Sequence, residues 1–139
     1  MRIEVPGIPA PQGSKRHIGG GRMIEMSKTV GPWRDSVIWH TRRACAEPLL
    51  GPVQVIAVFF FPRPKGHYGT GRNAAVLRPS APMSPDGRPD LDKLARAVLD
   101  GLTQGGAFKD DSQVCELLTR KKYGPRPGCV LVVEPLEVA

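Results

Sequence analysis

Several carboxylates gather in one short part of a strongly basic chain. Asp90, Asp92 and Asp100 lie within the stretch RPDLDKLARAVLDGL, and Asp110 and Asp111 follow soon after a Gly-Gly pair. Carboxylates this close together repel one another unless a positive group lies among them. That group could be a helix N-terminus, a neighbouring basic residue or a metal ion, and each alternative has a different functional consequence.

A helix predicted at about 91–104 offers a purely structural explanation for three of these residues. Asp92, Arg96 and Asp100 are spaced four apart, so they share one stripe of that helix. Asp90 or Asp92 could cap the helix, where backbone N–H groups and the helix dipole favour negative charge. Asp100 could pair with Arg96. Under this explanation none of these carboxylates has a catalytic task.

The second acidic pair, Asp110 and Asp111, favours a different explanation. Alone, the pair would be an ordinary turn. Capping needs only one acidic residue, however, and the helix start carries both Asp90 and Asp92. If the strand predicted at 112–123 packs beside the helix start, three carboxylates converge. Mg²⁺, a hard cation that prefers oxygen ligands, suits such a site.

The overall charge indicates a polyanionic partner. The chain has 20 Lys and Arg against 13 Asp and Glu, a formal net charge of +7. Nucleic acid is the first candidate and an acidic membrane surface the second. Mg²⁺ held by carboxylates can activate water and stabilise charge during phosphodiester hydrolysis. Surrounding basic residues would bring DNA to a site that would otherwise repel it.

The order of elements predicts an α+β fold, a mixed sheet with two main helices packed on it. With 139 residues, the chain is expected to form a single domain, 1–139. Strands are predicted from RIEVPGIP, from the apolar run VQVIAVFFF, from SQVCELLTRKKY and, after a GPRPG turn, from the returning CVLVVEPL. The first helix is PWRDSVIWHTRRACA, whose predicted apolar face is formed by Trp33, Val37, Ile38, Ala44 and Cys45.

The long segment 62–89 has no clear periodicity and is rich in Gly, Pro and basic residues. It is either an unstructured insertion or a basic arm that orders on a phosphate backbone. Candidate DNA contacts, here and in the basic Gly-rich stretch near the N-terminus, are Lys15, Arg16, Arg63, Lys65, Arg72, Arg78 and Arg88.

The cysteines and the apolar runs argue against disulfide-bonded, zinc-binding, secreted and membrane-spanning proteins. Cys45, Cys115 and Cys129 are odd in number and widely spaced, so neither a disulfide framework nor a zinc cluster is expected. The N-terminus lacks the apolar region of a signal peptide, and the run at 53–61 is too short to cross a bilayer. We expect a cytoplasmic protein without a membrane partner or a small-molecule cofactor.

The acidic stretch resembles the RusA family of Holliday junction resolvases. That family has an Asp-x-Asp-Asn-Leu-x-Lys pattern, a helix ending in Asp-x-Leu and then an Asp-Asp pair, to which DLDKLARAVLDGL and KDDSQV correspond. GIPAPQGSKR and WRDSV agree more loosely. The resemblance implies that Asp90, Asp92 and Asp111 are metal-binding catalytic carboxylates, with Asp110 as a neighbour at the metal site. It implies Mg²⁺ as the cofactor, with Mn²⁺ as an alternative ion.

Two basic residues depart from the family pattern. Lys93 stands where the pattern has Asn, and Arg96 stands where it has Lys. Arg can stabilise charge on phosphate but cannot donate a proton as an ammonium group does. Either residue could therefore assist the chemistry. The resemblance further implies a homodimer that makes paired incisions in four-way DNA, in a bacterial or phage-infected cell, and two-fold symmetry suits a nearly two-fold junction.

Three other functions remain open from the sequence. The chain could be a DNA-binding protein without catalytic activity, with its acids serving as caps and ion pairs. It could be a less selective nuclease acting on flaps or other branched DNA. An RNA-binding module ranks last, because Trp33, Trp39, Tyr68 and Tyr123 form no recognisable RNA-binding signature.

Overall fold

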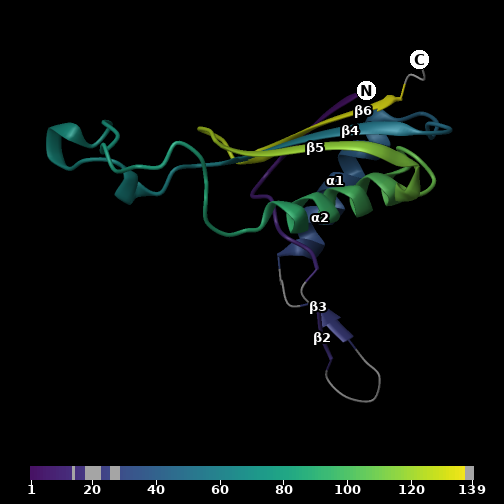
Figure 1. Cartoon of the computed structure of the whole chain (residues 1–139), viewed down its shortest axis with the longest axis horizontal. Coiled ribbons are helices and arrows are strands. Elements are labelled where there is room, and N and C mark those ends of the chain that lie inside the picture. Colours follow the sequence, from purple (N-terminus) through teal and green to yellow (C-terminus); the bar gives the residue numbers. More distant parts are fainter. Residues whose placement is uncertain (14, 18–22, 26–28, 137–139) are drawn as a thin grey trace.

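A four-stranded mixed sheet with two helices on one face forms the body of the protein (Figure 1). The structure is a computed structural model that describes residues 1–13, 15–17, 23–25 and 29–136. The strand order is β1 (Arg2–Pro6), β6 (Gly128–Pro135), β4 (Val53–Phe61) and β5 (Val114–Tyr123). The helices are α1 (Val30–Ala44) and α2 (Leu91–Gly105). The predicted α+β class and order of main elements are confirmed.

The most apolar strand, β4, lies inside the sheet. Its alternate residues Val53, Val55, Ala57 and Phe59 are buried on the face that the helices cover. β4 pairs antiparallel with β6 and parallel with β5. The returning strand β6 therefore does not pair with β5, its neighbour in sequence, because β4 lies between them. This order leaves β5 as an edge strand with one side unpaired.

Helix α1 buries a slightly different face from the predicted one. Trp33 and Val37 are buried as expected, but Ala44 is exposed, and Thr41 is fully buried in its place. The Thr41 hydroxyl donates to the Val37 carbonyl at 2.7 Å, so its polar group is satisfied inside the helix. The helix begins at Val30, which places Pro32 in the first turn, where it costs no hydrogen bond.

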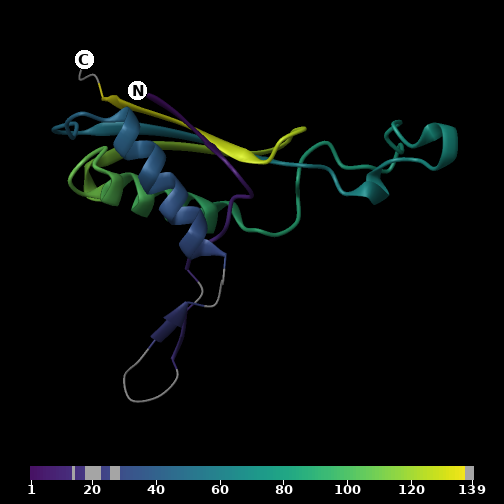
Figure 2. The same cartoon turned by 180° about the vertical axis from the view of Figure 1, so that it is seen from behind.

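The two helices pack against each other (Figure 2), and two glycines of α2 lie at their contact. A Cβ added at Gly101 would lie 2.5 Å from Val37 Cγ1, and one at Gly105 would lie 2.6 Å from Thr41 Cβ. Real side chains do not tolerate such distances. The absence of side chains at these two positions therefore sets how closely α2 packs on α1.

Two extensions leave the body. β2 (Lys15–His17) and β3 (Met23–Glu25) form a separate two-stranded antiparallel sheet. Residues 62–89, which we call the arm, project beyond the end of the sheet (Figure 1). The arm contains two short 3₁₀ helices, Lys65–His67 and Gly71–Asn73. Within the described residues, no helix is long and apolar enough to cross a membrane.

Candidate functional site

Asp90 occupies the N-cap position of α2, but its side chain makes no capping hydrogen bond. Its carboxylate instead lies 3.5 Å from the Lys93 ammonium group, one helical turn away. Asp92, in the first turn, is exposed. The capping explanation is therefore wrong for Asp90. The positive end of the helix dipole still favours both carboxylates, so the fold presents two acids at the start of α2 without using the first of them as a cap.

Asp110 and Asp111 have different surroundings, although they are adjacent. Asp110 caps the short 3₁₀ helix Asp111–Gln113, and the Gln113 side chain accepts from the Asp110 backbone N–H at 3.2 Å. The Ser112 hydroxyl donates to the Asp110 carboxylate at 2.8 Å, and this bond is the main reason that the pKa of Asp110 is lowered. Asp110 therefore has a local structural role.

The carboxyl group of Asp111 lacks such compensation. Partial desolvation raises the pKa of Asp111, and the neighbouring carboxyl groups of Asp110 and Asp100 raise it further. A cation beside Asp111 would relieve this repulsion, and its carboxylate oxygens are the kind of ligand that a hard ion such as Mg²⁺ prefers. The sequence pointed to Asp111, but it gave no sign that the charge of Asp100 acts on its carboxyl group.

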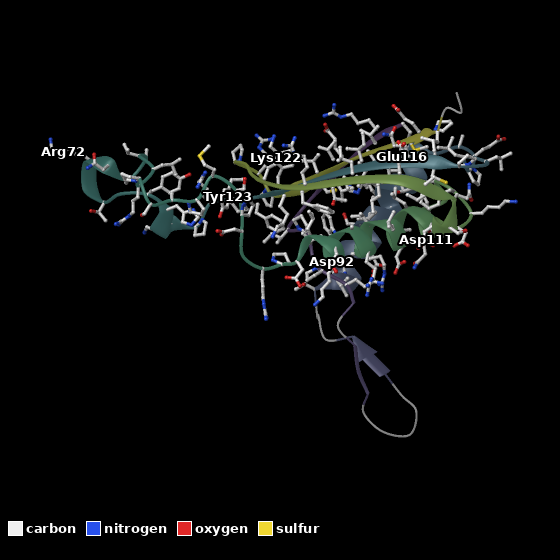
Figure 3. The ribbon with its side chains drawn as sticks, in the orientation of Figure 1. Arg72, Asp92, Asp111, Glu116, Lys122 and Tyr123 are labelled. Atoms are coloured by element: carbon white, nitrogen blue, oxygen red, sulfur yellow. The ribbon has the colours of Figure 1, made fainter. Side chains whose placement is uncertain are left out.

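A groove between α2 and β5 joins the acidic residues. Its volume is about 600 Å³, and it is lined by Leu91, Asp92, Ala95, Arg96, Leu99, Asp111, Leu117 and Thr119. Asp92 and Asp111 thus line the same hollow, and Figure 3 shows them toward opposite ends of α2. Arg96, one turn after Asp92, supplies a guanidinium group suited to phosphate oxygens. The groove combines two carboxylates, one cation and an apolar floor.

The direction of β5 keeps the two ends of the groove apart. Helix α2 has 15 residues and is about 22 Å long. The chain reverses at Gly106, whose φ of 89° ends the helix in the left-handed conformation. β5 therefore begins near the C-terminal half of α2 and ends beside the helix start, where Lys121 bonds to the Pro89 carbonyl. In one chain, the start of β5 does not pack beside the helix start.

The three predicted ligands consequently do not converge in a single chain. Among the described residues, no group of three or more Asp, Glu, His or Cys side chains is close enough to hold a metal ion. The structure brings Asp92 and Asp111 to one groove and places Asp90 beside Lys93. The assignment of Asp90, Asp92 and Asp111 as metal ligands stays a prediction.

The N-terminal segment packs over the middle of α2. Gln12 is buried, accepts from the Arg34 guanidinium at 2.6 Å and donates to the Asp100 carboxylate. Asp100 forms no ion pair with Arg96 among the described residues, so that alternative is wrong. A Cβ added at Gly13 would lie 2.5 Å from Arg96 Nη1, so Gly13 makes room for this guanidinium. Gln12 went unnoticed in the sequence, although it lies in the stretch GIPAPQGSKR.

The candidate DNA contacts divide into three groups. Lys15 and Arg16 belong to β2, and their side chains lie outside the described part. Arg63 and Arg78 are engaged within the arm, since they donate to the backbone oxygens of Pro82 and Tyr68, both at 2.7 Å. The remaining three, Lys65, Arg72 and Arg88, are exposed.

Comparison with known proteins gives one informative match. The family model described as Endodeoxyribonuclease RusA matches residues 5–134, which include both helices and nearly all of the sheet. Comparison with curated proteins found no significant match. The family match extends far beyond the acidic stretch, so it covers the groove, the arm and the edge strand together.

Proposed function

Because the chain belongs to the RusA endodeoxyribonuclease family, we propose that it is a Mg²⁺-dependent endonuclease that resolves four-way DNA junctions by paired incision. The observation that carries the proposal is the groove in which Asp92, Arg96 and Asp111 face one space inside the matched region. The net charge of +7 suits a DNA substrate.

The charged residues in and beside the groove have roles in the proposed reaction. Asp92 and Asp111, together with Asp90, would hold the cation. Mg²⁺ held there would supply an activated water and charge stabilisation at the attacked phosphate. Arg96 donates to a phosphate oxygen and holds the strand in place, and Lys93 limits the repulsion between Asp90 and the DNA.

A homodimer accounts for the separation of the carboxylates. β5 is an edge strand with an unpaired side, and Leu117 and Leu118 near its middle are 45% and 55% exposed. Two β5 strands pairing antiparallel around Leu118 would place Glu116 opposite the partner's Arg120, a favourable cross-strand pair. The start of each strand would then lie beside the end of the other.

This pairing would complete the metal site between two chains. The end of β5 lies beside Asp90, because Lys121 contacts the adjacent Pro89. The partner's Asp111 would therefore approach the Asp90–Asp92 end of the groove. Two identical sites related by a two-fold axis suit paired cuts in a junction that is itself nearly two-fold symmetric.

The test is cleavage of a synthetic four-way junction by the wild type and by Asp92→Asn. Loss of a metal ligand costs several kcal/mol of stabilisation, so cleavage should fall on the order of 10³-fold. Junction binding without metal should survive, because the substitution removes a negative charge near the phosphates. Cleavage by Asp92→Asn at the wild-type rate, or wild-type cleavage without divalent metal, would refute the proposal. Three-way and linear DNA as substrates separate a junction resolvase from a less selective nuclease.

A further inference from the structure

The outgoing end of the arm is fixed to the last residue of β5. The Arg63 guanidinium lies over the Tyr123 ring at 4.2 Å from its centre, and the His67 ring meets the same ring edge-on at 5.5 Å between centroids. Arg63 also donates to the Pro82 carbonyl, which belongs to the returning half of the arm. The base of the arm is thus a packed structure.

The returning end of the arm is fixed to Lys121, two residues earlier on β5. Its ammonium group donates to the carbonyl oxygens of Gly87 at 2.7 Å and Pro89 at 2.9 Å. Lys121 and Tyr123 lie on the same face of the strand because side chains alternate. Asp90 directly follows Pro89. The residues that hold the arm therefore also hold the segment that leads into a proposed metal ligand.

The tip of the arm has a defined backbone but buries nothing. Gly69 N–H donates to the Val76 carbonyl at 2.9 Å, and Arg78 N–H donates to the His67 carbonyl at 2.8 Å. Every residue from 71 to 80 is nevertheless exposed. Among the apolar side chains of the arm, Met83 is 89% exposed. Loops of this length are uncommon in a compact domain unless they are functional or disordered, and the hydrogen-bonded backbone of the arm favours a function.

Charge indicates which partner fits the arm. It carries five Lys and Arg residues against a single acid, Asp86. Arg63 and Arg78 bond to backbone oxygens within the arm, and Lys65, Arg72 and Arg88, like Arg78, are exposed. Arg72 lies at the far end of the arm (Figure 3). This distribution suits the phosphate backbone of DNA.

We propose that the arm grips a limb of branched DNA away from the cut, and that Lys121 is the positioning residue that couples this grip to Asp90. The inference rests on the proposed function. In the proposed dimer the arms leave from opposite ends of the paired β5 strands. A four-way junction can engage both arms with separate limbs, whereas a duplex bound at one site engages one. The arm is thus a specificity determinant for branched substrates.

Binding without metal tests the grip. The variant with Lys65→Ala and Arg72→Ala should bind the four-way junction about tenfold more weakly, with a salt dependence shallower by about 1.8 in slope, as expected for two lost phosphate contacts. Its affinity for linear duplex should fall less. The matched control, Arg2→Ala with Arg42→Ala, removes the same charge from β1 and α1 and should retain junction affinity. An equal loss for both substrates, or dissociation of the dimer by the arm variant, would overturn the proposal.

Cleavage tests the coupling. Lys121→Met keeps the aliphatic stem and removes the ammonium donors. At saturating junction it should cut at least tenfold more slowly and need more Mg²⁺ for half-maximal rate, and Lys121→Arg should restore both values in part. A wild-type rate and Mg²⁺ dependence in Lys121→Met would overturn the positioning role. If instead the wild type cuts no branched DNA, the proposed function itself has failed.

Discussion

Mixing two inactive variants would show whether the groove is completed across a dimer. Homodimers of Asp92→Asn and of Asp111→Asn lack a carboxylate at every site. In a mixed dimer whose sites combine Asp92 of one protomer with the partner's Asp111, one site is intact and the other lacks both acids. Random exchange makes about half of the dimers mixed. About a quarter of all sites should therefore be intact.

The assay is nicking of a four-way junction after subunit exchange, with exchange verified by a size tag on one variant. The nicking rate should reach about a quarter of the wild-type rate, and the product should carry single nicks, because each active dimer has one site. The matched control mixes Asp90→Asn with Asp92→Asn, whose acids belong to the same end of one groove, and should stay inactive. Verified exchange without recovered nicking would refute the shared site.

Three further predictions concern the body of the protein. Gly101→Ala should lower the free energy of unfolding by about 1–3 kcal/mol, because the new methyl group overlaps Val37 and this outweighs the better helix propensity of Ala; unchanged stability in urea denaturation would contradict this packing. Gln12→Ala should cost about 1–3 kcal/mol in the same measurement, since it leaves two partly buried side-chain partners unsatisfied, and Gln12→Glu should cost at least as much. A thiol reagent should modify exposed Cys115 in the native protein but Cys129 only after unfolding, because burial both covers Cys129 and raises its pKa; equal native rates would show that β6 is less protected.

Sequence predicts best the helices and strands whose buried residues follow a plain apolar pattern. The run at 53–61 is apolar except for Gln54 and becomes an inner strand of the sheet, and the helix predicted at about 91–104 forms at Leu91–Gly105. The buried face of α1 was harder to predict, because Thr41 can be buried only when its hydroxyl bonds to the Val37 carbonyl. The position of β4 between β5 and β6 was also hidden, since no local pattern records strand order.

The candidate site was predictable in residue type but not in arrangement. Spacing identified the acids of α2 and the Asp110–Asp111 pair, but only the structure shows that the Asp90 side chain does not cap the helix. The burial of Gln12 could not be predicted, because a lone polar residue in a Pro- and Gly-rich loop is normally exposed. Its burial depends on partners from α1 and α2 that are distant in sequence.

The direction of β5 determines which carboxylates a single chain can bring together around a metal ion. A short reversal after a helix of about 22 Å leaves no length of chain to bring Asp111 back to the helix start. Any site that uses both ends of the groove therefore needs a second start of β5, and the unpaired edge of that strand is the surface that could supply it. The same direction brings Lys121 to the segment before Asp90. In the proposed dimer, β5 would pair the two protomers, hold the arm and set the positions of the carboxylates. A substitution in β5 should therefore lower the cutting rate more readily than it lowers the stability of the core.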